Sequence, residues 1–156
     1  MTGPFRVPVD KQSPTVYRAL GAVAVEIGNR AAEIGLDRSI LELVNIRVSQ
    51  INRCAFCLDL HTHRALVAGE TPQRIAVLPA WREVDLYSVR ERAALEIAEG
   101  VTQVNSEHLD DEQYAPLRRF LSEDEISLLV WGAVTINAFN RVSILSGHRI
   151  KERSRP

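Results

Sequence analysis

The sequence lacks the features that mark nucleic-acid-binding, secreted or membrane proteins. Lys and Arg (19) are balanced by Asp and Glu (20), which gives a formal net charge of −1. A general nucleic-acid binder usually carries a basic excess, so we do not expect that class. No apolar run approaches the length of about 18 residues that a membrane span needs. The N-terminus shows no charged-then-apolar signal pattern. We therefore expect a cytoplasmic protein that binds neither nucleic acid nor membrane.

The composition is that of an ordinary folded domain. Hydrophobic residues make up 46% of the chain and charged residues 25%, which excludes disorder, collagen-like repeats and coiled-coil fibres. A chain of 156 residues buries roughly 70% of its unfolded surface when it folds, so one apolar core can hold it. We expect one domain over residues 13–148, preceded by an extended arm (residues 1–12) and followed by a charged tail (residues 149–156).

Strand signals are missing as well. No Asn-Gly or Asp-Gly turn joins alternating runs, and Val and Ile recur at helical spacing. The pattern predicts an all-α domain of six or seven helices. The expected helices cover residues 14–34, 37–51, 54–69, 72–79, 88–101, 110–117 and 126–145.

Local patterns indicate how some of these helices begin and pack. Ser-x-x-Glu capping patterns mark starts at Ser39, Ser88 and Ser122. The last helix is apolar around most of its circumference, so we expect it to be largely buried. A domain of this size can hardly bury such a helix alone. We therefore predict that part of this helix, or of the first one, packs against another subunit in a homo-oligomer.

The two cysteines, Cys54 and Cys57, form a single Cys-x-x-Cys, too few for a disulfide framework. At a helix start they lie at i and i+3, and His61 follows Cys57 by four residues on the same face. The positive helix end lowers a thiol pKa, and an imidazole one turn away can take the thiol proton. The second thiol can condense with a sulfenic acid on the first. These are the parts of a thiol peroxidase.

The cysteine pair is also compatible with other kinds of site. Structural zinc usually needs four ligands, and Cys54, Cys57 and His61 supply three. A c-type haem needs His directly after the second cysteine, where the chain has Leu58, and a thioredoxin motif needs a βαβ setting. The cysteines could also be two inert buried side chains with a purely structural role. Glu42 has a structural alternative as well, because the Ser-x-x-Glu pattern at Ser39 makes Glu42 a possible helix cap.

Glu42 precedes Cys54 by twelve residues. With Cys57 and His61 this spacing resembles the alkylhydroperoxidase D-like (AhpD-like) group of the carboxymuconolactone decarboxylase superfamily. The similarity is most specific between residues 37 and 69 and extends over most of the chain. It implies an all-helical fold and an oligomer, commonly a trimer or hexamer.

The resemblance also implies roles for the four residues. Cys57 would attack the peroxide and become a sulfenic acid, while Cys54 would donate a proton to the leaving group and then resolve the sulfenic acid. His61 and Glu42 would form the relay, partly through water, that deprotonates the thiols. No cofactor or metal is implied. The implied reductant is a dithiol, such as the lipoyl group of a partner protein.

Two departures from the family pattern bear on function. Phe56 stands where AhpD itself has His, which removes a polar group beside the attacking thiol. Carboxymuconolactone decarboxylases proper generally lack the cysteine pair, so we do not expect decarboxylation. The sequence predicts a peroxidase for hydrogen peroxide or organic hydroperoxides. The alternatives are a thiol–disulfide oxidoreductase or redox sensor, and a non-enzymatic helical module with a Cys/His metal site.

Overall fold

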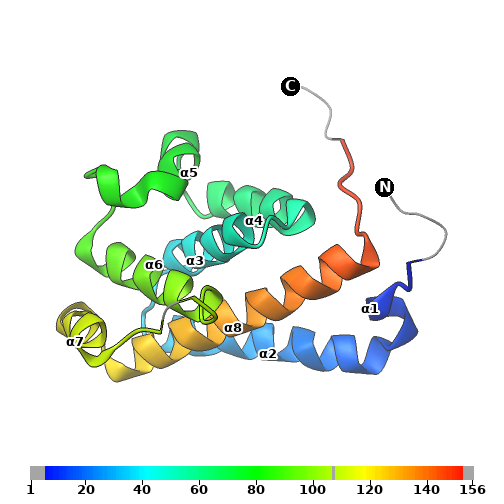
Figure 1. The fold of residues 1–156 in the computed structure, drawn as a ribbon, viewed down its shortest axis with the longest axis horizontal. Helices are drawn as coiled ribbons and strands as arrows, with labels where there is room; N and C mark the ends of the chain where they lie inside the picture. The colour runs from blue at the N-terminus through cyan, green and yellow to red at the C-terminus, as the bar shows by residue number, and fades with distance from the viewer. Residues whose placement is uncertain (1–5, 107, 153–156) are drawn as a thin grey trace.

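The computed structural model describes residues 6–106 and 108–152, and every regular element within them is a helix (Figure 1). The all-α prediction is confirmed for this part of the chain. The elements are α1 (Val9–Gln12), α2 (Pro14–Glu33), α3 (Arg38–Ile51), α4 (Ala55–Val67), α5 (Pro72–Val77), the 3₁₀ helix η1 (Leu78–Glu83), α6 (Val89–Thr102), α7 (Asp111–Phe120) and α8 (Glu123–Ser146).

The predicted number of six or seven helices is too low, because the described residues form eight α-helices and one 3₁₀ helix. The extended conformation expected for residues 1–12 is wrong at Val9–Gln12, a single turn too short for a periodic pattern to reveal. Residues 1–5 of that arm and 153–156 of the tail lie outside the described residues. The short helix expected at residues 72–79 is α5, which ends at Val77, just before Pro79. Pro79 itself lies in the first turn of the 3₁₀ helix η1, where a missing N–H costs nothing.

Capping boxes open three helices. Two of them are the predicted boxes at Ser88 and Ser122, each completed by the glutamate three residues later. A third box, at Asp110, opens α7. The predicted box at Ser39 is wrong, because Asp37 caps α3 by accepting a hydrogen bond of 2.9 Å from the Ser39 N–H.

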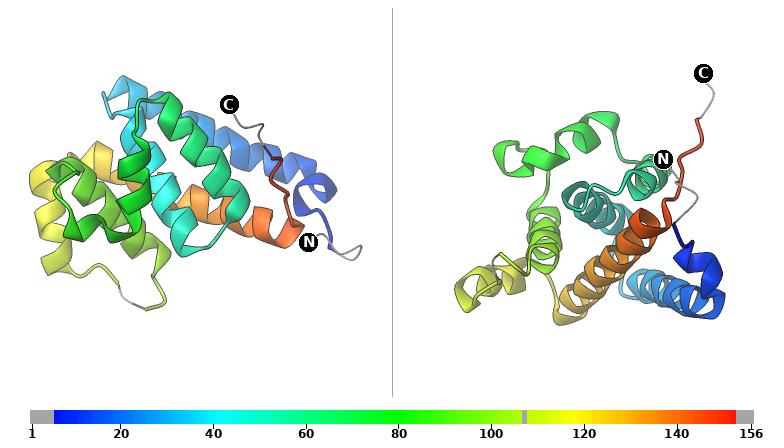
Figure 2. Two further views of the ribbon diagram at one scale, coloured as in Figure 1. Left: turned by 90° about the horizontal axis from the view of Figure 1, so that it is seen from above. Right: turned by 45° about the vertical axis from the view of Figure 1, so that its right-hand side comes forward.

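Helices α3 and α8 form the centre of the fold. Helix α8 runs beside α2 in the opposite direction, and α3 contacts α4, α6 and α8 (Figures 1 and 2). One apolar cluster joins α2, α3, α6 and α8 and includes both cysteines, while a smaller one joins α3, α4, η1 and α6. Because α3 contributes to both clusters, it is fixed from two sides.

Helix α8 is less completely buried than its sequence predicts. Its inner side packs on α2, α3 and α6, whereas Trp131 is 56% exposed and Val134 and Leu145 are exposed as well. Within the single chain the expected burial is therefore met only on the inner side, and burial of the rest against another subunit stays a prediction. By length and composition alone α8 is apolar enough to cross a membrane, contrary to expectation. Here it is the central helix of a packed domain.

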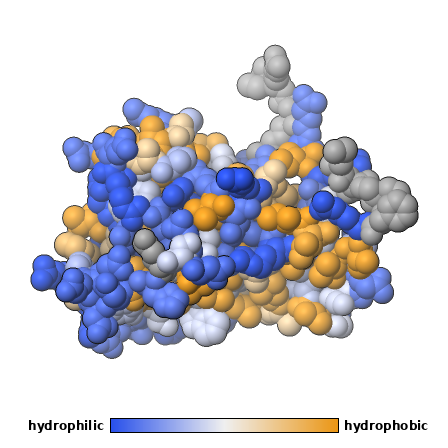
Figure 3. All heavy atoms as spheres, in the orientation of Figure 1, coloured by the Kyte–Doolittle hydropathy of each residue, from blue (hydrophilic) through white to orange (hydrophobic). Residues whose placement is uncertain are grey.

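Exposed apolar side chains gather at one end of the molecule, over α1, the beginning of α2 and the end of α8 (Figure 3). This surface is available for the predicted contact with another subunit, which stays a prediction. The exposed apolar residues of these helices and of the chain beside them are Val7, Val9, Val16, Ile144, Leu145 and Ile150.

Candidate active site

A tight turn between α3 and α4 fixes Cys54. The N–H of Arg53 donates to the carbonyl of Gln50 (3.2 Å) and that of Cys54 to the carbonyl of Ser49 (3.0 Å), which is the Schellman pattern of a helix end. Arg53 has φ 56°, the left-handed conformation that usually falls to glycine. Cys54 is at once the N-cap of α4, so α4 packs back along α3.

Cys57 lies in the first turn of α4, beside the free N–H groups of the helix start. The hydrogen bond from Cys54 is the largest cause that lowers its pKa; burial opposes this, and contacts with Asn140 and Ser143 and the charge of His61 assist it. The resulting pKa of Cys57 is about 6. The same hydrogen bond, together with burial, raises the pKa of Cys54 far above its ordinary value. At neutral pH Cys57 is therefore a thiolate and Cys54 a thiol.

Glu42 of α3 and His61 of the neighbouring helix α4 form a buried pair. Oε2 of Glu42 lies 2.7 Å from Nδ1 of His61, and Oε1 accepts hydrogen bonds of 2.9 and 2.5 Å from Arg38. Burial alone would raise the pKa of Glu42, but the contacts with His61 and Arg38 outweigh it and lower the pKa. A carboxylate on Nδ1 selects the tautomer whose Nε2 is free to accept a proton. The helix-cap interpretation of Glu42 is wrong, since its side chain is buried against His61.

Two residues of α8 complete the site, and sequence reasoning missed both. The buried side chain of Asn140 donates to Oγ of Ser49 (3.0 Å) and accepts from Asn52 (2.9 Å). Asn140 also hydrogen-bonds with Cys57, and Ser143 hydrogen-bonds with both thiols. The sequence did contain one signal for Asn140, because a polar residue at a buried position of an apolar helix needs a hydrogen-bond partner. Its partner Ser49, 91 positions away, has no signature in the sequence.

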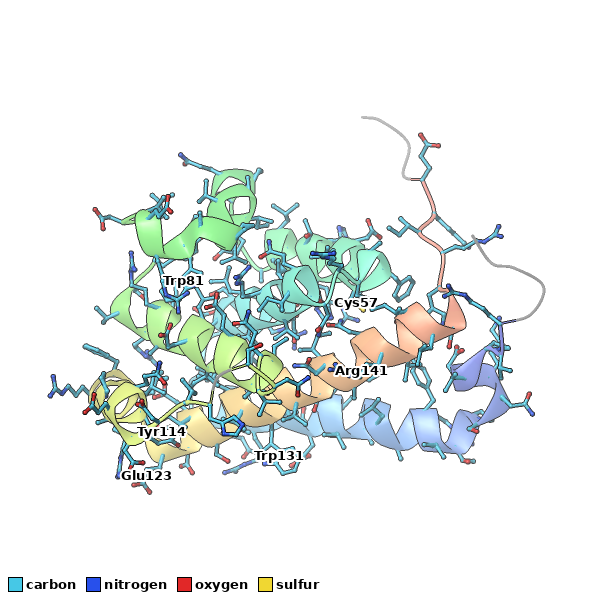
Figure 4. All side chains as sticks on the ribbon, viewed as in Figure 1. Cys57, Trp81, Tyr114, Glu123, Trp131 and Arg141 are labelled. Atoms are coloured by element: carbon cyan, nitrogen blue, oxygen red, sulfur yellow. The ribbon has the colours of Figure 1, made fainter. Side chains whose placement is uncertain are left out.

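A groove of about 1180 Å³ leads to Cys57 between α2, α4 and α8. Cys57 lies on the side of α4 that faces α8 (Figure 4) and is 3% exposed. Cys57 and His61 both line the groove, and its other walls are mainly apolar. The apolar side chains that line the groove include Tyr17, Ile27, Phe56, Leu60, Ile136 and Phe139.

The structure brings all four predicted site residues into one region. Glu42 comes from α3, Cys54 from the turn, and Cys57 and His61 from α4. Among the described residues, no three Cys, His, Asp or Glu side chains converge as metal ligands do. The donor set needed for the alternative metal module is therefore not assembled in this part of the chain.

Comparison with known proteins agrees with this geometry. The sequence profile of the carboxymuconolactone decarboxylase family matches residues 14–100, which include the cysteine pair, His61 and Glu42. The chain belongs to this family. Its fold is AhpD-like, because a structure from Agrobacterium tumefaciens superposes with a TM-score of 0.83 at 30% identity, covering 94% of this chain and 99% of the other. That protein, of unknown function, is described as a candidate antioxidant defence protein AhpD.

Two relatives are similar in sequence. The uncharacterized protein YdfG of Bacillus subtilis (strain 168) is 42% identical over 127 residues, which cover 81% of this chain and 86% of YdfG. The uncharacterized protein YnjA of Escherichia coli (strain K12) is 32% identical over 67 residues, which cover 43% of this chain and 37% of YnjA. Neither name carries an activity, so the function is argued from the site.

Proposed function

We propose that the protein is a thiol peroxidase of the AhpD type with a role in antioxidant defence. The observation that carries the proposal is Cys57, a thiolate at neutral pH, held beside a second thiol and a His61–Glu42 pair at an apolar groove. An activated thiol, a resolving thiol and a base are what peroxide reduction through a disulfide requires. The antioxidant description of the Agrobacterium protein supports the same conclusion.

The chemistry proceeds in two steps. The Cys57 thiolate, stabilised by Cys54 and by the charge of His61, attacks the terminal oxygen of the hydroperoxide. The O–O bond breaks, Cys57 becomes a sulfenic acid, and the alkoxide takes a proton to leave as an alcohol. Cys54 then attacks the oxidised sulfur, so that an S–S bond forms, the S–O bond breaks and water leaves. A dithiol reduces the disulfide and restores both thiols.

The groove bears on the substrate class. Its mainly apolar walls can hold the organic part of an alkyl hydroperoxide with the reactive oxygen at Cys57, whereas hydrogen peroxide gains nothing from them. We therefore expect organic hydroperoxides to have the lower KM. We propose as reductant a dithiol on a partner protein, such as a lipoyl group whose arm would enter the same groove, and we propose the end surface described above as a contact in a homo-oligomer.

The test is peroxide consumption with dihydrolipoamide, set beside a plain dithiol. Cys57→Ser should abolish turnover. Cys54→Ser should permit one oxidation and leave a sulfenic acid that dimedone traps. If Cys57 is not oxidised by any hydroperoxide, the protein is not a peroxidase. If it is oxidised once but never turns over with a dithiol, the redox-sensor alternative is favoured.

A further inference from the structure

A second imidazole reaches the cysteine pair from the end of α8. Nδ1 of His148 lies 3.1 Å from Oγ of Ser143, and its Nε2 lies 3.3 Å from Oδ1 of Asp10. Ser143 is buried and hydrogen-bonds with both Cys54 and Cys57. A carboxylate, an imidazole and a hydroxyl thus form a continuous chain that ends at the thiols.

This chain is built by several independent contacts. Gly147, in the left-handed conformation with φ 67°, turns the backbone so that the N–H of His148 donates to the Ser143 carbonyl (3.0 Å). The ring of Phe56 packs edge-on against the ring of His148 at 5.1 Å. The Val9 N–H donates to Oγ of Ser146 (3.0 Å), which holds α1 and its Asp10 against α8.

Oδ1 of Asp10 is buried and has no hydrogen bond beyond this ion-pair contact with His148 among the described residues. Burial alone would raise the pKa of Asp10, but the contact with His148, helped by backbone hydrogen bonds at Asp10 and Lys11, outweighs it and lowers the pKa. His148 is the only side chain that contacts this carboxylate among the described residues, so the pair is more specific than surface packing requires. It suits a device that keeps the imidazole oriented and ready to accept a proton.

We propose that Asp10, His148 and Ser143 form a second proton relay, which serves Cys54 in the disulfide-forming step; this rests on the proposed peroxidase function. His61 lines the groove with Cys57, so it is placed to give its proton to the departing alkoxide. Cys54 is 1% exposed and does not line the groove. It therefore keeps its own proton through the first step, in contrast to the donor role that the family resemblance implies.

The second step then balances through Ser143. The Cys54 proton passes to the Ser143 hydroxyl while Ser143 gives its proton to His148, and Asp10 stabilises the imidazolium. The Cys54 sulfur attacks the Cys57 sulfur, an S–S bond forms and the S–O bond breaks. The relay returns the proton through Ser143 to the departing hydroxide, which leaves as water. Ser143 can do this because it contacts both sulfur atoms.

The experiment separates the two steps in a single turnover. Protein reduced beforehand is mixed with cumene hydroperoxide, Cys57 sulfenic acid is trapped with dimedone, and disulfide is counted by alkylation of the remaining thiols. In Ser143→Ala and His148→Gln, the disulfide should form at least about tenfold more slowly, below the usual 10²-fold for a lost base because water can substitute in part. The sulfenic acid should accumulate, and in His148→Gln its rate of formation should stay within about threefold of the parent's, whereas Ser143→Ala also loses a hydrogen bond to Cys57 and serves only to measure the disulfide step. His108→Gln, which changes an exposed histidine of the loop before α7, is the matched control.

The pH profile distinguishes a relay from a structural contact. The titratable groups around the relay are Asp10, Tyr17 of α2 and the two thiols; burial and then the charge of Asp10 raise the pKa of Tyr17, so it stays neutral. Disulfide formation in His148→Gln should therefore recover as the pH rises and hydroxide takes the Cys54 proton. Parent-like disulfide formation in both variants, or a loss that is the same at every pH, overturns the relay. A parent that forms no sulfenic acid overturns the peroxidase proposal instead.

Discussion

Two buried glutamates can be compared, one in the proposed active site and one in a cluster of permanent charges. Glu99 on α6 accepts hydrogen bonds from Trp81 (2.9 Å), Arg47 (2.7 Å) and Arg82 (2.6 Å). Glu42 on α3 holds His61 and one arginine, Arg38.

The partners of Glu99 are a neutral indole and two permanent cations, so nothing in this cluster can exchange a proton near neutral pH. The imidazole of His61, which contacts Glu42, belongs to the one side-chain type that ordinarily exchanges a proton in this pH range. Both carboxylates have a lowered pKa, by similar contacts, and both are opposed by burial. A shifted pKa alone therefore does not mark a catalytic group in this protein. The partner's ability to release a proton does.

The sharpest way to test this contrast is to neutralise each glutamate. In Glu42→Gln, the peroxide-dependent oxidation of Cys57 should fall by about 10²-fold at neutral pH, because His61 loses the carboxylate that selects its tautomer. Glu99→Gln is the matched variant, with the same change in a buried site, and its oxidation rate should stay within about twofold of the parent's. Stopped-flow oxidation with a hydroperoxide measures both. Equal losses in the two variants would end the distinction.

The second prediction reverses the comparison. Glu99→Gln should lower the free energy of unfolding by about 3 kcal/mol, because it leaves the buried end of Arg47 without its carboxylate. Glu42→Gln should cost less, since Arg38 is 54% exposed and can turn to water. Urea unfolding followed by circular dichroism gives both values. A larger loss in Glu42→Gln would make Glu42 the structural residue.

The pH dependence of stability follows from the lowered pKa of Glu99. A carboxylate whose folded pKa lies below its unfolded value of 4.5 stabilises the fold above that pH. The contribution is lost as the pH falls through the folded pKa. The parent should therefore lose stability more steeply than Glu99→Gln below about pH 4.5. Parallel acid denaturation curves would contradict the assignment.

The fourth prediction concerns the Cys57 thiolate. Alkylation of Cys57 by iodoacetamide should rise with a midpoint near pH 6 rather than near 9, the ordinary value. Cys54→Ala removes the largest cause of the shift and should move the midpoint upward. His61→Ala removes a charge that helps lower the Cys57 pKa, so it should also slow peroxide oxidation at neutral pH, and that loss should shrink above pH 9, the ordinary pKa of the thiol. A pH–rate profile of His61→Ala that matches the parent in shape and height would remove His61 as the base.

The smallest expected effect is at Arg38. This side chain is half exposed, and exposed ion pairs contribute about 0 to 1 kcal/mol. Arg38→Ala should therefore slow Cys57 oxidation by less than about fivefold, and added salt should reduce the difference. A loss as large as that of Glu42→Gln would mean that the arginine, rather than the imidazole, sets the function of Glu42.

The sequence predicts those site residues that lie close together along the chain. Cys54, Cys57 and His61 share one helix start, and Glu42 lies on the adjoining helix, so the family spacing captures all four. Asn140 and the relay residues are distant from the cysteines in the sequence, and only tertiary packing brings them to the thiols.

The fold shows the same limit. Helices with a clear apolar period and the caps at Ser88 and Ser122 were predictable, because their causes lie within a few residues. The one-turn helix Val9–Gln12 was not, and neither was the exposed side of α8 with Trp131. Periodicity measures how apolar a helix is, whereas the side that neighbours cover depends on how the helices pack.

The turn at Arg53 also orders the assembly of the site during synthesis. Glu42 and His61 are 19 residues apart, so they can meet once the α3–α4 hairpin has closed. Ser143 belongs to α8, which is synthesised after α3 and α4. A nascent chain can therefore carry the paired acid and imidazole before it has the α8 contacts that help lower the Cys57 pKa. Under the proposed function, the docking of α8 would complete the activation of Cys57, so that the unfinished chain is less readily oxidised than the folded one.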